Sequence, residues 1–203
     1  MVPARSKFKT PDDGLDPAVL QQVVRREGPA MAVFFEYYYD RVYAHVAQLT
    51  RDRTIAEDLT QEIFIRLQKT IERLNPERDP TGWVFTVATN VVRDHWRSAG
   101  QRRRGAEVST EAAGAHRLPH PDPDVAAVLE QDEELRAVWK ALDEVSTEDR
   151  EVILLRDFEE LPTEEIARML DLNPDAVRQR HSRAVARLAK AFKEARPGEG
   201  GGP

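Results

Sequence analysis

Apolar residues recur along most of this chain at the three- and four-residue spacing of amphipathic helices. Alternation of the kind that marks β-strands between hairpin turns is not seen anywhere in the sequence. The pattern therefore predicts an all-α protein. The expected helices cover Pro17–Arg26, Ala30–Thr50, Ile55–Leu74, Thr81–Ser98, Val125–Val145, Glu148–Phe158, Glu164–Leu170 and Pro174–Glu194.

A polar stretch divides these helices into two groups of four. Between Gly100 and Pro123 the sequence has little apolar periodicity, and its prolines oppose a continuous helix. Polar ends interrupted by proline and glycine are typical of disordered tails. We therefore expect two small helical domains, residues 17–100 and 125–195, with a flexible linker at 101–124 and tails at 1–16 and 196–203.

The segment from Leu161 to Leu188 has the layout of a helix-turn-helix. Thr163 is expected to cap its first helix, and Asn173 followed by Pro174 is expected to begin the second. The outward side of that second helix offers the forked donors that base edges and phosphates require. A basic surface helix without a ligand is the alternative. The candidate DNA-binding residues are Arg178, Gln179, Ser182, Arg183 and Arg187.

The predicted helix Ile55–Leu74 has an apolar stripe for the core and an opposite polar face that contains one isoleucine. That face carries Asp58, Gln61, Glu62 and Ile65. A single exposed isoleucine is common on protein surfaces, but with these polar neighbours the face also suits a protein partner.

The predicted helix Thr81–Ser98 is also two-sided. Its polar side combines an indole, an amide and guanidinium groups, which together can stack on unpaired bases and hold phosphates of single-stranded DNA. The alternative is that Trp83 packs against the loop at residues 75–80 and the arginines are only solvated. The candidate strand-binding residues are Trp83, Thr86, Asn90, Arg93 and Arg97.

Charge is unevenly distributed along the 203 residues, whose net charge is −6. Residues 106–175 carry 20 acidic and 6 basic side chains, whereas residues 176–203 carry 7 basic and 2 acidic ones. This separation suggests that the ends of the chain bind phosphates, while the acidic middle stays off DNA or faces a basic partner.

Composition argues against several other classes of protein. The chain has no cysteine, its five histidines lack metal-ligand spacing, and it has no glycine-rich phosphate loop. We therefore expect no enzyme, no metal and no cofactor. No apolar run reaches the roughly 18 residues of a membrane span, and the first residues lack the apolar core of a signal peptide. We expect a cytoplasmic protein without membrane insertion.

Three segments resemble the extracytoplasmic-function (ECF) group of bacterial RNA polymerase sigma factors. They are AEDLTQEIFIRL at Ala56–Leu67, GWVFTVATNVVRDHWR at Gly82–Arg97, and the helix-turn-helix beyond the linker. The resemblance spans roughly Val19 to Phe192. Asp171 stands where the family usually has glycine in the turn, and aspartate tolerates the left-handed conformation needed there.

The resemblance implies a function for each part of the chain. Residues 17–100, region two, would bind the β′ clamp helices of core polymerase through Asp58, Gln61, Glu62 and Ile65, and would open the minus-ten element. The loop Arg73–Pro80 would recognise a flipped base, and Trp83, Thr86, Asn90, Arg93 and Arg97 would contact the melted strand. Residues 125–195, region four, would read the minus-thirty-five element through Arg178, Gln179, Ser182, Arg183 and Arg187 and would contact the β flap.

The resemblance also implies promoter-specific initiation without catalysis by this chain, for a stress or envelope-signal regulon controlled by an anti-sigma factor. One alternative stays open. A helix-turn-helix repressor or activator that acts without being a polymerase subunit would use the first domain as a sensor or dimerisation domain.

Overall fold

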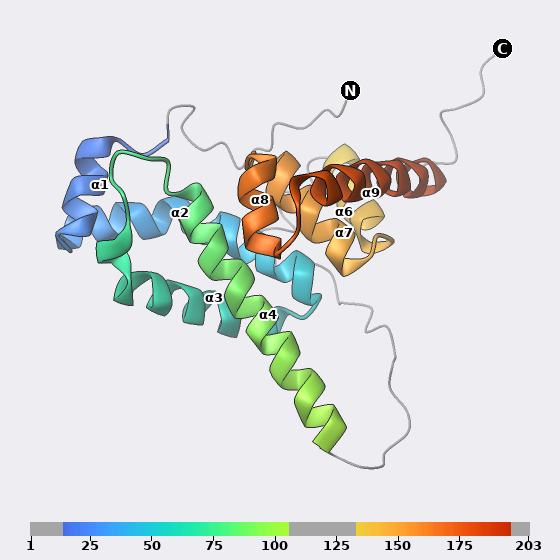
Figure 1. The fold of residues 1–203 in the computed structure, drawn as a ribbon, viewed down its shortest axis with the longest axis horizontal. Helices are drawn as coiled ribbons and strands as arrows, with labels where there is room; N and C mark the ends of the chain where they lie inside the picture. The colour runs from blue at the N-terminus through green and yellow to red at the C-terminus, as the bar shows by residue number, and fades with distance from the viewer. Residues whose placement is uncertain (1–13, 106–132, 196–203) are drawn as a thin grey trace. The chain divides into compact units, whose positions relative to one another are not determined.

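The structure, a computed structural model, describes residues 14–105 and 133–195 (Figure 1). Regular secondary structure in these ranges is entirely helical, which confirms the predicted all-α fold. The described residues belong to two separate compact units, one in each range. Most of the predicted tails, the linker beyond Gly105 and the first part of the helix predicted from Val125 lie outside the described residues.

The described residues of the first unit form four α-helices and one short 3-10 helix. Two of the helices begin at aspartate caps: Asp16 accepts a hydrogen bond from the backbone N–H of Ala18 at 2.7 Å, and Asp52 accepts one from Ile55 at 3.0 Å. The elements are α1 (Pro17–Val24), α2 (Gly28–Thr50), α3 (Arg53–Lys69), η1 (Ile71–Arg73) and α4 (Thr81–Gly105).

Two predicted boundaries in this unit were wrong. The helix predicted to reach Leu74 ends at Lys69, because the N–H of Thr70 bonds the carbonyls of both Arg66 and Leu67 and the chain tightens into η1. The helix predicted to end at Ser98 continues to Gly105. Residues 101–104 are one glutamine and three arginines, which favour helix and prolong it beyond the apolar pattern.

The core of the first unit lies around α2, which packs against α1, α3 and α4. Burying a large apolar side chain completely contributes about 1.5–3 kcal/mol, so the set of fully buried residues stabilises the unit. The largest of them are Phe34, Tyr38, Ile63, Leu67, Ile71 and Phe85.

The second unit is built on α9 (Pro174–Ala195), which packs against α6 (Glu133–Asp143), α7 (Thr147–Ile153) and α8 (Thr163–Leu170) (Figure 1). A π-helical turn, η2 (Leu154–Phe158), continues α7. The buried residues at the centre are Leu142, Val145, Ile153 and Ala184.

The helix-turn-helix is formed by α8 and α9, and two of its three predicted capping and turn residues take the predicted roles. Asp171 adopts the left-handed conformation at φ 54°, and the side chain of Asn173 caps α9 by accepting the N–H of Ala176 at 2.7 Å. The predicted cap at Thr163 was wrong. Thr163 is the first residue of α8, and its hydroxyl instead accepts a hydrogen bond from the guanidinium of Arg156.

A buried arginine completes the second unit. Arg150 on α7 is 1% exposed, and its guanidinium donates to the carbonyl of Leu142 at 2.9 Å and to that of Val145 at 2.8 Å. The carbonyl of Leu142 lies in the last turn of α6, whose C-terminal end carries a partial negative charge, and the carbonyl of Val145 follows two residues after the helix ends. Arg150 therefore caps α6 from a neighbouring helix.

Candidate functional site

The predicted base-reading residues of α9 lie together. Arg178, Gln179, Ser182 and Arg183 are exposed and line one open depression on the helix surface. The opposite side of α9 is held by Val177 and Ala184, which are completely buried. Packing therefore fixes the helix so that these four side chains face outward.

Two arginines on this helix are paired with carboxylates in the same domain. Arg178 contacts Asp175 at 2.6 Å and Glu164 at 4.0 Å, and Arg187 contacts Asp149 of α7. Arg187 does not line the depression with the other four candidates. It lies at the junction of α9 with α7, about one turn farther along the helix from Arg183.

His181 lies beside these candidates, and its Nε2 lies 2.8 Å from a carboxylate oxygen of Asp157 in η2. It is a half-buried residue at the edge of the core.

On α3 the predicted partner-binding residues also share one outward surface. Asp58, Gln61 and Ile65 are exposed, and Glu62 is partly exposed. Ile65 is 50% exposed, one of the highest values among the large apolar side chains of the described residues. These four residues are called the α3 face below.

The strand-binding candidates on α4 are less uniform. Asn90 and Arg97 are exposed, whereas Trp83, Thr86 and Arg93 are partly buried. Thr86 donates its hydroxyl to the carbonyl of Gly82 at 2.7 Å, which leaves it less available to a ligand. These five residues are called the α4 strip below.

A second indole on α4 escaped the sequence analysis. Trp96 is 41% exposed, and its ring contacts His95 edge-on with centroids 5.3 Å apart. It precedes Arg97 directly, so an exposed aromatic ring and a guanidinium occupy adjacent positions of the helix, about 100° apart around its axis.

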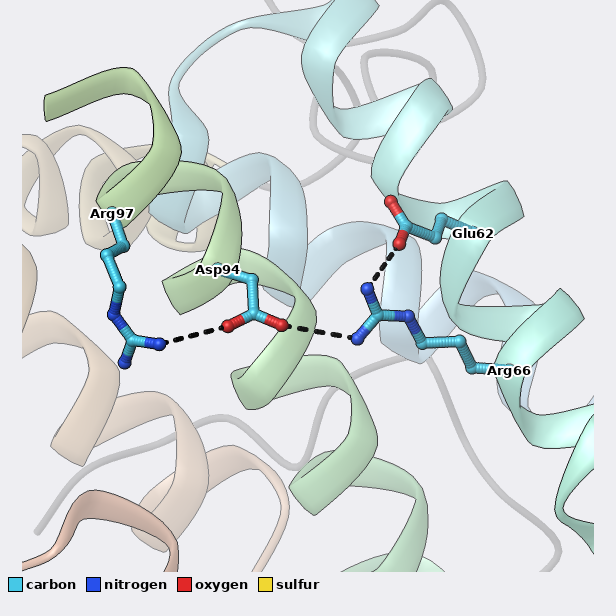
Figure 2. A network of polar contacts seen from close by, with 4 residues as sticks. All are labelled: Glu62, Arg66, Asp94 and Arg97. Carbon is cyan, nitrogen blue, oxygen red and sulfur yellow. Dashed lines mark hydrogen bonds and ion pairs between the residues drawn. The ribbon is translucent and has the colours of Figure 1, made fainter. Parts of the chain in front are cut away.

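An ion-pair network links the α3 face to the α4 strip (Figure 2). Arg66 on α3 donates to Glu62 at 2.5 Å and to Asp94 on α4 at 3.4 Å, and Asp94 also accepts from Arg97 at 3.4 Å. Partial burial alone lowers the pKa of Arg66, but the hydrogen bonds to Glu62 and Asp94 outweigh that effect and raise the pKa. The spacing of Glu62 with Arg66 and of Asp94 with Arg97 is visible in the sequence, whereas the link between helices is not.

The loop predicted to recognise a base is anchored at both ends. Leu74 is buried at its start, and at its end Asp79 accepts both the N–H of Thr81 at 2.9 Å and the hydroxyl of Thr81 at 2.7 Å. Just before the loop, Arg26 in the connection between α1 and α2 forms an ion pair with Glu72 of η1 at 2.9 Å. Asn75, between these anchors, is exposed to solvent.

Comparisons with known protein families identify both units. Residues 34–103 match Sigma-70 region 2, and residues 135–188 match Sigma-70 region 4. These matches cover the α3 face, the α4 strip and all five candidates on α9.

Individual proteins agree with these matches. The chain is 30% identical to the ECF RNA polymerase sigma factor BldN of Streptomyces coelicolor, over 88% of this chain and 68% of that protein. It is 25% identical to the RNA polymerase sigma-H factor of Pseudomonas aeruginosa, over 88% of this chain and 94% of that protein. Its fold matches the sigma factor RpoE of Bartonella quintana, solved with the anti-sigma factor NepR, with a TM-score of 0.59 and 21% identity over 80% of this chain and 96% of that one.

These similarities confirm the resemblance seen in the sequence and favour it over a repressor or activator acting without polymerase. Sigma factors are initiation factors that work with the catalytic polymerase. Within the described ranges, no helix is both long and apolar enough to cross a bilayer. The chain belongs to the ECF group of RNA polymerase sigma factors.

Proposed function

We propose that this chain directs core RNA polymerase to its promoters by dividing three contacts among three helices. The α3 face binds the β′ clamp helices, the α4 strip holds the melted minus-ten strand, and α9 reads the minus-thirty-five element. One observation carries the proposal: an acidic face with an exposed isoleucine and a strip of cationic and aromatic residues lie on adjacent helices of one domain.

The α3 face suits a protein partner with basic side chains around an apolar contact. Ile65 is exposed, and Asp58 and Glu62 provide negative charge on the same side of the helix. An apolar centre within a charged rim is the usual anatomy of a protein interface.

The α4 strip suits a single strand of DNA. The half-buried indole of Trp83 offers a stacking surface, Asn90 can bond base edges, and Arg93 and Arg97 can hold phosphates. The exposed part of the loop Arg73–Pro80 lies between two anchored ends, so it can form a fixed pocket for a flipped base.

On α9 the exposed face that carries the base-reading candidates suits the major groove of duplex DNA, which admits an α-helix. Arginine and glutamine are side chains that read guanine and adenine edges, and Arg178, Gln179 and Arg183 stand there together. Arg187 at the edge suits a phosphate. The acidic first half of this domain would face the β flap of polymerase.

We further infer that an anti-sigma factor controls the chain by covering the surfaces that polymerase uses. The Bartonella sigma factor of the same fold was solved with such a partner. In this proposal the chain works in the cytoplasm and performs no catalysis itself, since polymerase supplies the chemistry.

Run-off transcription tests the proposal. Core polymerase with and without the full chain is incubated with fragmented genomic DNA, and the transcript starts are sequenced. We expect starts at a shared pair of promoter elements only when the chain is present. Starts that do not depend on the chain, or tight sequence-specific duplex binding by the chain alone with no effect on polymerase, would favour the repressor or activator alternative.

A further inference from the structure

A chain of four alternating charges joins the outer surfaces of α3 and α4. Figure 2 shows Asp94 between Arg97 and Arg66, with Glu62 beyond Arg66 on α3. The two ends of this network belong to the two proposed interfaces of region two, since Glu62 is part of the α3 face and Arg97 is part of the α4 strip. A ligand at one end can therefore change the charge balance at the other.

The two inner residues of the network are each shared by two partners. Arg66 directs Nη2 to Glu62 at 2.5 Å and Nη1 to Asp94 at 3.4 Å, while the second oxygen of Asp94 lies 3.4 Å from Nη1 of Arg97. Arg66 is thus held more closely by Glu62 than by Asp94. If Glu62 found another partner, the guanidinium could move fully onto Asp94.

Asp94 is a carboxylate on the helix that is proposed to hold a DNA strand, one residue after Arg93 and three before Arg97. An unneutralised carboxylate there repels phosphates, and it also competes with them for Arg97. A cation from α3 that neutralises Asp94 removes both effects. The side chain of Arg97 is 71% exposed, so it can turn toward a phosphate once Asp94 has another partner.

We propose that Arg66 is a positioning residue that couples polymerase binding to DNA binding: when a basic partner takes Glu62, Arg66 pairs with Asp94 and releases Arg97 to a phosphate of single-stranded DNA. The inference rests on the proposed function of the α3 face and the α4 strip. It adds two residues, Arg66 and Asp94, to the working parts of region two.

The test uses the full chain without polymerase and a labelled single-stranded oligonucleotide of mixed sequence, because a phosphate contact needs no particular bases. Binding is measured by fluorescence anisotropy over a range of salt concentrations. Glu62→Gln imitates the loss of Glu62 to a partner, and Asp94→Asn removes the competitor of Arg97. Both variants are expected to bind the strand more tightly than the natural chain, whereas Arg66→Gln is expected to bind less tightly.

Exposed ion pairs are weak, so the expected changes are about two- to fivefold in affinity. Salt dependence gives a second readout that a purely structural role would not change. Each phosphate contact adds about 0.7 to the slope of log affinity against log salt for single strands. Glu62→Gln and Asp94→Asn should steepen this slope by up to that amount, and Arg66→Gln should flatten it.

Two comparisons make the test specific. Glu57 lies on the same helix and pairs with Arg53 at 2.8 Å with a similar spacing, so Glu57→Gln removes the same charge without touching the network. It should change binding less than Glu62→Gln does. In the Asp94→Asn background, Arg66→Gln should lose most of its effect, since Asp94 is the group through which Arg66 acts.

Equal effects of Glu62→Gln and Glu57→Gln would overturn the proposal, as would an effect of Arg66→Gln that is the same with and without Asp94. Absence of strand binding by the natural chain would also overturn it. Failure of the proposed function is recognised separately, because it appears as a loss of chain-dependent transcript starts in the run-off assay, whatever the variants do to strand binding.

Discussion

The hydroxyl of Tyr38 on α2 lies 3.0 Å from the hydroxyl of Thr81, the first residue of α4. Both side chains are buried. Because Thr81 donates its own hydrogen to Asp79, Tyr38 is the donor in this contact. Burial raises the pKa of Tyr38, which keeps the phenol protonated and able to donate. The pair ties the end of the loop Arg73–Pro80 to the core.

Tyr38→Phe should loosen this end of the loop. Losing one buried hydrogen bond costs about 1 kcal/mol. Amides that exchange only when the loop opens should therefore exchange roughly fivefold faster. Mass spectrometry of the exchanged amides at residues 74–86 measures the change. Tyr39→Phe removes a hydroxyl from a ring that is 47% exposed and serves as the control. Equal exchange in both variants would show that the Tyr38 contact does not stabilise the loop.

The buried imidazole of His45 should make region two sensitive to acid. Burial lowers the pKa of His45 from its ordinary value of 6.5 to about 4. The unfolded chain therefore binds a proton more readily than the folded chain does between these values, and stability falls as the pH falls from 6.5 to 4. A pKa difference of this size lowers the free energy of unfolding at pH 4 by about 3 kcal/mol relative to its value above pH 6.5.

His45→Leu should remove that part of the pH dependence and should stabilise region two most at low pH. Leucine leaves no polar nitrogen inside, whereas within the described residues neither nitrogen of His45 has a hydrogen-bond partner. The effect is measured at several pH values by unfolding the chain in denaturant and monitoring region two by hydrogen exchange. His95→Gln, which removes a half-buried imidazole from the same domain, gives the comparison. A pH profile of His45→Leu that parallels the natural chain would contradict the prediction.

Arg150→Met should destabilise region four strongly. The variant keeps most of the side-chain volume but removes the guanidinium hydrogen bonds to the carbonyls of Leu142 and Val145, so that the carbonyl of Leu142 keeps only the backbone N–H of Val145, at a total cost of about 2–3 kcal/mol. Hydrogen exchange at residues 137–145 should speed up with little change in region two.

Arg150→Lys should recover only part of the loss, because one ammonium group cannot reproduce the fork that reaches both carbonyls. Arg168→Met, on an exposed position of α8, should leave exchange at residues 137–145 near that of the natural chain. If Arg150→Met and Arg168→Met behave alike, the buried cap is not a stabilising element.

The helices and their exposed faces were predictable because they follow from local periodicity. The outward position of Gln179 and Ser182 follows from the buried position of Val177 and Ala184, each two residues away and so on the opposite side of the helix, and the exposure of Ile65 follows in the same way from its neighbours on α3. The caps at Asp171 and Asn173 depend on neighbouring residues only, so they were also accessible.

Contacts between helices were not predictable from one sequence. Arg150 looks like an ordinary surface arginine in the pattern of α7, and its burial depends on where α6 ends. The Arg66 to Asp94 contact joins residues 28 positions apart, so no local spacing reveals it. Thr163 was assigned as a cap because its residue type is favoured there, but the approach of Arg156 gives its hydroxyl a different partner.

Ile65→Ala should weaken the complex with core polymerase by about tenfold, since an apolar anchor at the centre of an interface contributes roughly 1–2 kcal/mol. Titration of the labelled chain with core enzyme measures the affinity. Val33→Ala is the matched control, because Val33 on α2 is 46% exposed and lies outside the proposed interfaces. Similar affinities for the two variants would remove Ile65 from the proposed contact.

On α9, loss of a base-reading residue and loss of a phosphate contact should have different signatures. Gln179 and Arg183 lie in the open depression, and a good bidentate contact discriminates against the wrong base by about 1–3 kcal/mol. Gln179→Ala and Arg183→Ala should each lower transcription and relax the preference at one or two positions of the minus-thirty-five element. Arg187 lies outside the depression and pairs with Asp149, so Arg187→Ala should lower binding about equally on all sequences.

Run-off transcription from a promoter library with a randomised minus-thirty-five element separates these outcomes. Lys193→Ala removes a positive charge from α9 about two turns beyond Arg187, and it reports the effect of net charge alone. The assignment of Gln179 and Arg183 as base readers requires that their variants change the selected sequences. If both variants reduce yield without changing those sequences, the depression binds the DNA backbone, and other residues of the chain read the minus-thirty-five element.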